Sequence, residues 1–282
     1  SGIKIYNNFQ DFNKKFKKKV DYTMCAISGL SGLKSTLDAI KFSKKIAIAN
    51  KESIICGWNL IEKNLKKNNT KFIPVDSEHF SIMNLLNDLG NNEVEKIFIT
   101  ASGGPFLNLP LNKFKNINPK NAIKHPNWKM GKKISIDSAT LMNKVFEVIE
   151  AKKIFNIDIK KFKIVVHPKS YVHAIVKFKN GLTKILIHDT DMKIPIFNSI
   201  YTNYQKPFLS KNINFNILNH LDFRKVNLIK FPSVNLIKKI PTKNSLFETV
   251  VVSANDELVN LFLQNKIKFK DIFYNLNKIT SL

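Results

Sequence analysis

Cysteine, arginine and long apolar runs are scarce in this chain, and each scarcity excludes a class of protein. The 282 residues include two cysteines, Cys25 and Cys56, which are too few for a disulfide scaffold and fit a reducing cytosol. No apolar run reaches the roughly 20 residues that a membrane-spanning helix needs, and the first residues lack the apolar stretch of a signal peptide. We therefore expect a cytoplasmic protein without a membrane partner.

Arg224 is the only arginine, although 46 basic and 21 acidic residues give a formal net charge of +25. Such an excess attracts phosphate groups, so nucleic acid is one candidate partner. Base recognition, however, relies on the planar fork of arginine, which lysine cannot imitate. Because the lysines are spread along the whole chain, we favour a solvated basic surface over a nucleic-acid footprint. A small anionic substrate remains compatible with this charge.

Apolar runs and amphipathic segments alternate along the chain, which predicts an α/β fold with a parallel sheet near the start. Later strands, expected to form a partly antiparallel sheet, are predicted at residues 163–167, 174–178 and 183–188, with a further short strand at 134–137. Helical periodicity predicts helices at residues 9–20, 139–154, 246–263 and 272–279. Residues 203–235 are rich in Asn, Lys and Pro and are predicted to be a linker.

Asp76 and Glu78 follow the predicted strand at residues 71–75. Alternate residues of a strand point the same way, and ligands of open α/β sheets bind at the carboxyl ends of strands. Two carboxylates there suit Mg²⁺ or Mn²⁺, which would need a third carboxylate from elsewhere. On this spacing alone, simple capping of the following helix is the favoured alternative.

The predicted helix at residues 139–154 places Asn143 and Glu147 on one face, with Lys144 beside them. Such a cluster could hold a metal ion and an anionic, hydroxylated ligand. Ser138 is expected to cap this helix, whose start would attract phosphate. The alternative is a solvated helix face with an ordinary pair of side chains.

Three loops add polar groups to the same prospective site. Residues 102–105 (Ser-Gly-Gly-Pro) form a turn whose backbone could approach an oxyanion, although a plain tight turn is the alternative. Residues 125–131 contain His125 and Trp128, and an aromatic loop can close over a ligand, unless the indole is buried in the core. Residues 50–52 (Asn-Lys-Glu) follow another predicted strand end.

Taken in order, these motifs closely resemble the 1-deoxy-D-xylulose 5-phosphate reductoisomerase family. The matching motifs are residues 49–53, 74–79, 102–106, 125–131 and 136–144. The likeness continues through residues 167–168, 191–195 and 253–257, so it covers nearly the whole chain.

The resemblance implies an NADPH-dependent and Mn²⁺- or Mg²⁺-dependent enzyme of non-mevalonate isoprenoid biosynthesis. Its reaction would isomerise and reduce 1-deoxy-D-xylulose 5-phosphate to 2-C-methyl-D-erythritol 4-phosphate, in a homodimer. Asp76, Glu78 and Glu147 would bind the metal, while Asn50, Glu52 and Gly131 would contact the cofactor. Substrate contacts are implied for Lys51, Ser77, Glu78, Ser102, His125, Trp128, Ser138, Asn143, Lys144 and Glu147, with catalytic roles for Lys51, Glu78 and His125.

The chain also departs from the family pattern. The glycine-rich βαβ unit that grips NADPH is not found here, so we expect a fragment that is inactive alone. Residues 1–75 would be the second half of the NADPH-binding domain, 76–202 the catalytic domain and 236–282 a small helical domain. Val145 and Phe146 stand where the family usually has Gly and Leu, which adds bulk beside Lys144.

Two other functions remain open from the sequence. One is a related metal-dependent oxidoreductase that acts on another sugar phosphate. The other is a non-catalytic basic fragment that binds phosphate or nucleic acid.

Overall fold

The computed structural model describes residues 4–5, 18–128, 130–201, 207–243 and 245–281 of the chain. They fall into two compact units, Ser1–Val75 and Asp76–Leu282. The helix predicted at residues 9–20 lies almost entirely outside the described residues. Within the described ranges, no helix combines the length and the apolar character needed to cross a membrane.

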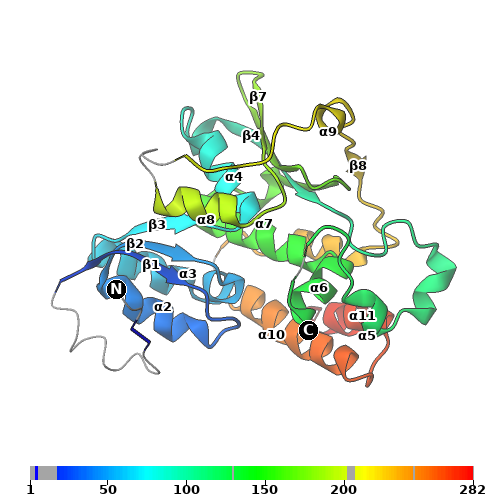
Figure 1. Cartoon of the computed structure of the whole chain (residues 1–282). Helices are drawn as coiled ribbons and strands as arrows, with labels where there is room; N and C mark the ends of the chain where they lie inside the picture. Colours follow the sequence, from blue (N-terminus) through cyan, green and yellow to red (C-terminus); the bar gives the residue numbers. More distant parts are fainter. Residues whose placement is uncertain (1–3, 6–17, 129, 202–206, 244, 282) are drawn as a thin grey trace. The chain divides into compact units, whose positions relative to one another are not determined.

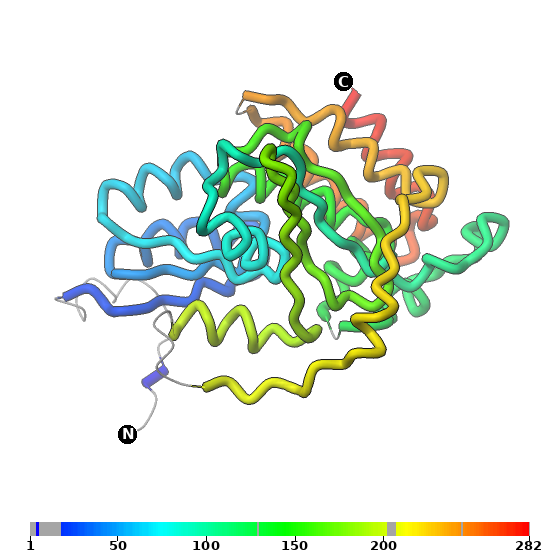
Figure 2. Tube along the Cα trace, turned by 90° about the horizontal axis from the view of Figure 1, so that it is seen from above, coloured from blue at the N-terminus to red at the C-terminus, as the bar shows by residue number. Residues whose placement is uncertain are grey.

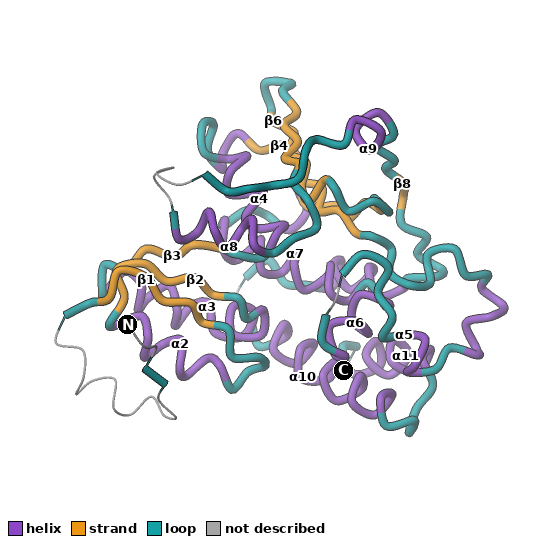
Figure 3. Tube along the Cα trace, viewed as in Figure 1, coloured by secondary structure: helices purple, strands orange, loops and turns teal. Residues whose placement is uncertain are grey.

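The first unit is a parallel sheet with helical crossovers (Figure 1). Its strands pair in the order β1 (Val20–Cys25), β2 (Ser43–Ile48) and β3 (Lys71–Pro74). The crossovers contain α2 (Gly32–Lys41) and α3 (Lys51–Lys67), which pack against each other. Because the strand order follows the chain order, both right-handed crossovers place their helices on one face of the sheet (Figure 3).

The second unit is built on a mixed five-stranded sheet, which confirms the α/β fold and its partly antiparallel part. The strands are β4 (Val94–Ala101), β5 (Phe162–Val166), β6 (Val172–Phe178), β7 (Thr183–Ile187) and β8 (Arg224–Lys225). β4 is central: it pairs in parallel with β5 and antiparallel with β6, while β7 and β8 form the two edges.

Helices of several lengths surround this sheet. The α-helices are α4 (Ser77–Leu86), α5 (Pro119–Ala122), α6 (Lys132–Ala139), α7 (Met142–Phe155), α8 (Lys193–Ile200), α9 (Phe215–Asn219), α10 (Phe247–Leu263) and α11 (Phe269–Ile279). The 3₁₀ helices span Asn91–Glu93, Leu111–Asn116, Ile159–Lys161 and Pro232–Lys239. α10 and α11 pack side by side, in orange and red (Figures 1 and 2).

α7 lies against β4 and is buried on nearly every side. Its fully buried apolar residues include Val145, Val148 and Ile149, and its buried polar residues include Glu147 and Glu150. A helix enclosed in this way cannot leave its charges in water, so they must find partners inside the protein. α7 therefore brings ionisable groups to the interior of the second unit.

Two local predictions were wrong. Residues 134–137 belong to α6 and not to a strand, because the alternation of polar and apolar residues there reflects a helix whose polar residues are also buried. α7 begins only at Met142, after Leu141 in the left-handed conformation (φ 59°). Ser138 therefore lies near the end of α6 and is not the cap of the following helix.

The expected linker at residues 203–235 contains structured parts. β8 pairs with β5, and the side chain of Phe231 is buried in a small core with Ala101 and Leu141. The contacts of the chain do not separate residues 236–282 from the rest of the second unit. The division into a catalytic domain, a linker and a helical domain stays a prediction.

β4 ends in a turn that positions the candidate site. Gly103 and Gly104 both have positive φ angles, 86° and 65°, which residues with a side chain rarely adopt. A Cβ atom added to Gly104 would lie 2.7 Å from the carbonyl oxygen of Ser138. The turn after β4 and the end of α6 are therefore in direct contact, and only glycine permits this approach.

We expect Gly104→Ala to lower the free energy of unfolding by about 1–3 kcal/mol more than Gly181→Ala does. Gly181 has a similar positive φ of 88°, but nothing lies within 4 Å of an added Cβ atom, so it isolates the backbone effect. Urea unfolding of both variants measures the difference. Equal losses would contradict the close contact with Ser138.

Candidate functional site

Three carboxylates converge between α4 and α7. Asp76 precedes α4, Glu78 lies in its first turn, and Glu147 lies in α7. One oxygen from each lies within 4.8 Å of the others; Glu78 and Glu147 are buried, whereas Asp76 is partly exposed. As the sequence predicts, Asp76 follows the end of β3, and the helix-capping alternative also holds: Asp76 is the N-cap of α4 and accepts a hydrogen bond from the Glu78 amide (3.2 Å). Asp76 thus caps α4 and also belongs to the group of three carboxylates.

Lys144 is the cation of this cluster. Its Nζ lies 2.8 Å from Glu147 Oε2 and also contacts Glu78 Oε1. Burial alone would lower the pKa of Lys144, but the charges of Glu147, Glu78 and Asp76 outweigh burial and raise it above its usual value. Three carboxylates and one ammonium leave a formal charge of 1 − 3 = −2. Oxygen ligands with this surplus charge fit a hard divalent cation.

A second metal-compatible set shares Asp76. Its other members are His79 and Glu150, both buried, and the ligand atoms again lie within 4.8 Å of one another. His79 Nε2 lies 2.9 Å from the Glu147 carbonyl oxygen, which can only accept, so Nε2 carries a proton. The other ring nitrogen, Nδ1, faces Asp76 Oδ1 at 3.7 Å. Geometry alone therefore allows two candidate metal sites.

Ser102 and His125 form a hydrogen-bonded pair at the turn after β4, with Ser102 Oγ and His125 Nε2 3.1 Å apart. His125 Nδ1 accepts from the amides of Asn127 (3.1 Å) and Trp128 (3.0 Å), so the proton of the neutral ring lies on Nε2 and is donated to Ser102. Burial, followed by the charge of Lys144, lowers the pKa of His125 to about 4, which keeps the ring neutral near pH 7.

The loop that contains Trp128 is tied to the segment after β5. Asn127 Nδ2 donates to the Pro168 carbonyl and to Ser170 Oγ, both at 2.8 Å. Trp128 is half-buried, and its ring meets the edge of the His173 ring at 6.4 Å between centroids. The indole is therefore not enclosed in the core, so the alternative interpretation of a buried Trp128 does not hold.

Three residues near this loop were missed by the sequence analysis: Ser170, His173 and His188. The rings of His173 and His188 are stacked, with centroids 3.9 Å apart. Burial, and then the charges of His188 and Lys144, lower the pKa of His173 well below its usual value. Ser170 could have been noticed because it ends the His-Pro-Lys-Ser motif at 167–170, but no local signal identifies His188.

Asn143 and the serines complete the polar surroundings of Lys144. Asn143 Nδ2 donates to Glu147 Oε1 (2.5 Å), and among the described residues no donor reaches its buried Oδ1. Ser77 Oγ donates to Glu78 Oε2 (2.5 Å), while Ser138 is largely buried beside Gly104. The acidic residues, Asn143 and Lys144 are thus one hydrogen-bonded cluster.

The remaining predicted residues are divided between the two units. Asn50, Lys51 and Glu52 lie at the start of α3 in the first unit, whereas Gly131 precedes α6 in the second. Asn50 is buried: its Oδ1 accepts from the Ser53 amide (2.7 Å), and its Nδ2 donates to the carbonyls of Ile27 and Gly29. These contacts hold the loop after β1. Roles in cofactor or substrate binding stay predictions for these residues.

Family models match three parts of the chain. The model of 1-deoxy-D-xylulose 5-phosphate reductoisomerase matches residues 3–57, and the model of its C-terminal domain matches residues 72–155. A third model, the DXP reductoisomerase C-terminal domain, matches residues 187–281. All three models therefore describe the same enzyme family.

Curated proteins give the same result. The chain is 63% identical to 1-deoxy-D-xylulose 5-phosphate reductoisomerase of Pelagibacter ubique over 279 residues, covering 98% of this chain and 72% of that protein. It is 40% identical to the reductoisomerase of a Sulfurihydrogenibium species over 271 residues, covering 96% of this chain and 71% of that protein.

Solved structures share the fold. The reductoisomerase of Zymomonas mobilis in complex with NADPH superimposes with a TM-score of 0.84 at 36% identity, covering 93% of this chain and 68% of that one. A second reductoisomerase, in complex with NADPH, fosmidomycin and magnesium, has a TM-score of 0.83 at 33% identity, covering 94% and 67%. With its carboxylate cluster, its motifs and these likenesses together, the chain belongs to the 1-deoxy-D-xylulose 5-phosphate reductoisomerase family.

Proposed function

We propose that this protein catalyses the NADPH- and divalent-metal-dependent conversion of 1-deoxy-D-xylulose 5-phosphate to 2-C-methyl-D-erythritol 4-phosphate. The observation that carries the proposal is the convergence of Asp76, Glu78 and Glu147 around Lys144. The charge of Lys144, within this cluster, also acts on His125 of the His125–Ser102 pair. The family to which the chain belongs is the reason for proposing this particular reaction and substrate.

In this proposal Asp76, Glu78 and Glu147 hold Mg²⁺ or Mn²⁺. The ion would polarise the ketone and hydroxyl oxygens of the substrate and stabilise the charge that develops as the carbon skeleton rearranges. Glu78 and Glu147 are held in place by Ser77, Asn143 and Lys144, so their oxygens are oriented before any ligand arrives.

The phosphate group is assigned to Ser102, Ser138, Asn143 and Lys144, with His125 behind Ser102. Ser102 Oγ accepts from His125 Nε2 and from the Gly104 amide (3.1 Å), which uses both of its lone pairs. The hydroxyl hydrogen of Ser102 is left to donate to a phosphate oxygen. Trp128, on the loop anchored by Asn127, would cover the substrate and exclude water.

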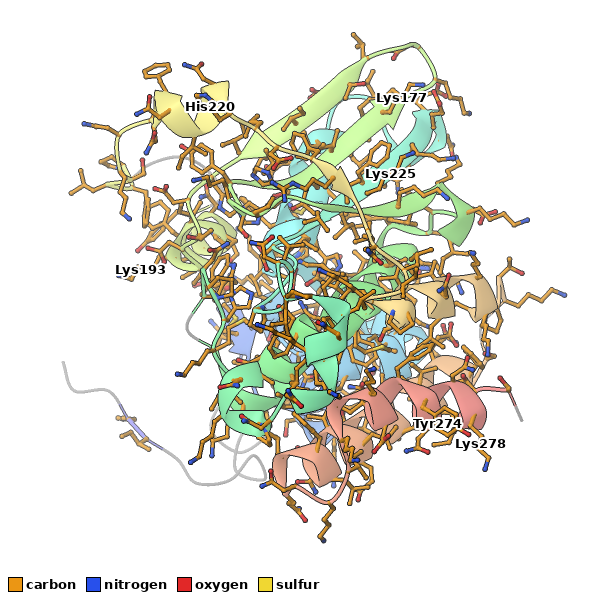
Figure 4. The ribbon with its side chains drawn as sticks, turned by 90° about the vertical axis from the view of Figure 1, so that its right-hand side faces the viewer. Lys177, Lys193, His220, Lys225, Tyr274 and Lys278 are labelled. Atoms are coloured by element: carbon orange, nitrogen blue, oxygen red, sulfur yellow. The ribbon has the colours of Figure 1, made fainter. Side chains whose placement is uncertain are left out.

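For the remaining assignments, the family resemblance is the support. We propose that Asn50, Glu52 and Gly131 contact NADPH, that Lys51 contacts the substrate, that Mn²⁺ can replace Mg²⁺, and that the protein works in the cytoplasm as a homodimer. Binding of nucleic acid is not favoured, since Lys177, Lys193, Lys225 and Lys278 stand on four different elements, with Lys193 and Lys278 far apart (Figure 4).

Fosmidomycin tests the proposed function directly. We expect the chain to bind this compound in the presence of Mg²⁺, as measured by isothermal titration, and to bind it much more weakly after chelation of the metal. The complete enzyme, given Mn²⁺ and substrate, should oxidise NADPH. An enzyme that reduces a different sugar phosphate instead would favour the related oxidoreductase.

A pair of substitutions in α7 distinguishes the two candidate metal sites. If the ion is held by Asp76, Glu78 and Glu147, then Glu147→Gln should weaken Mn²⁺ binding by at least about tenfold, since a carboxylate ligand is lost. Glu150→Gln, one turn along the same helix, removes no ligand of this set and should weaken Mn²⁺ binding much less than Glu147→Gln. Titrations followed by electron paramagnetic resonance measure both; the reverse order would assign the ion to the set with His79 and Glu150.

His125 should make stability depend on pH. Its pKa is about 4 in the folded chain, against an ordinary value of 6.5, so the unfolded chain takes up the proton first as the pH falls. The stability associated with the neutral ring is present above pH 6.5 and is lost as the pH falls towards 4. We expect His125→Gln to reduce the pH dependence of urea unfolding over this window.

His220→Gln is the matched control, because His220 is exposed directly after α9 and its ring contacts the Asn216 carbonyl oxygen of that helix. That variant should retain the pH dependence of the unsubstituted chain. If His125→Gln also retained the full pH dependence of unfolding, the assignment of a neutral, desolvated ring to His125 would be wrong.

A further inference from the structure

Four polar residues connect α6, the helix that contains Ser138, to α10. Asn255 Nδ2 of α10 donates to Asp137 Oδ1 of α6 at 2.8 Å. Lys133, at the start of α6, lies 3.1 Å from Asp137 Oδ2 and 2.9 Å from Asp256 Oδ1. We call these residues, Lys133, Asp137, Asn255 and Asp256, the α6–α10 network.

The buried members of the network depend on one another. Asp137 is 2% exposed and Asn255 is fully buried. Burial raises the pKa of Asp137, and the charge of Lys133 and the hydrogen bond from Asn255 oppose that change. A carboxylate buried this deeply is costly unless both oxygens have partners. In Asp137, Oδ1 is paired with Asn255 and Oδ2 with Lys133, so the loss of either partner should shift α6.

Lys133 also reaches a third helix. Its Nζ lies 5.3 Å from the centre of the Phe146 ring, a distance typical of a cation–π contact. Phe146 is buried in α7 directly before Glu147. The bulky residue that replaces the family's usual leucine therefore contacts Lys133, and Lys133 links α6, α7 and α10.

The network holds α6 at both ends. Asp137 directly precedes Ser138, and Lys133 follows the loop at 125–131 by two positions. On the other side, the Ser138 carbonyl touches the glycine turn that contains Ser102. α6 is therefore clamped between that turn and α10, and its position sets where the Ser138 hydroxyl lies relative to Ser102.

We propose that Asp137 and Asn255 are positioning residues for the phosphate end of the site: α10 holds α6 at the position where Ser138 and Ser102 grip the same phosphate group. The carboxylate cluster lies on α4 and α7 and does not use this contact. This inference rests on the proposed function, since it assumes that Ser102 and Ser138 bind phosphate.

Inorganic phosphate and Mn²⁺, titrated separately, serve as probes of the two ends of the site. We expect Asn255→Ala to weaken phosphate binding by about tenfold or more and to leave Mn²⁺ affinity within about twofold. If the unsubstituted chain bound no phosphate, the proposed function would fail. If it bound phosphate and Asn255→Ala bound it equally well, only the positioning role would fail.

Glu248→Gln is the matched control on α10. Glu248 is fully buried and pairs with Lys152 (3.4 Å) and Lys153 (3.6 Å) of α7, so its loss loosens α10 without touching α6. We expect phosphate affinity to stay within about twofold in this variant. An equal loss in both variants would mean that α10 contributes only to general packing, which overturns the proposal.

An exchange of the two side chains guards against simple misfolding. Asn255→Asp alone places a second carboxylate against Asp137 and should weaken phosphate binding more than Asn255→Ala. Adding Asp137→Asn restores one carboxylate and one amide across the same contact, and should recover most of the affinity. Additive losses in the double variant would contradict the proposal, because independent structural defects add whereas a shared contact does not.

Discussion

The contact between the Lys144 ammonium and the carboxylates of Glu78 and Glu147 is the interaction on which the candidate site depends. Like charges in a buried place repel strongly, so three carboxylates could not converge there without a cation among them. Lys144 neutralises one of the three negative charges, and a divalent ion would neutralise the other two. Its field also reaches His125 and His173, where it disfavours protonation. One side chain thus acts on both the proposed metal end and the proposed phosphate end of the site.

α7 makes this arrangement possible because it is packed against the central strand β4 and enclosed by other elements. An exposed helix would let water screen Lys144 and Glu147, and their mutual orientation would be loose. Buried, they are held by hydrogen bonds with few alternatives. The apolar residues of α7 form the core, and its polar residues form the site, so stability and function depend on the same helix.

α6 is the second element that the site requires, and it is held from two sides. Gly104 allows the turn after β4 to touch the Ser138 carbonyl, while Asp137 and Lys133 bind α6 to α10. Buried polar contacts therefore connect α10 to α6, which carries Ser138 of the proposed phosphate end of the site. The motif at residues 253–257 includes Asn255, and the positioning role proposed for Asn255 gives this part of the family pattern a function.

The sequence by itself determined the α/β fold and the family, since periodicity and ordered motifs are local properties of the chain. It also predicted that Asp76, Glu78 and Glu147 meet, and the structure brings their oxygens within 4.8 Å of one another. It could not determine that Asp76 both caps a helix and joins the carboxylate cluster, that residues 134–137 are helical, or that His188 stacks on His173. Only the tertiary structure brought Asn255 to Asp137, which is 118 positions away. Such contacts depend on how buried faces pack together, and a buried polar residue has the same local pattern whether its partner is distant or absent.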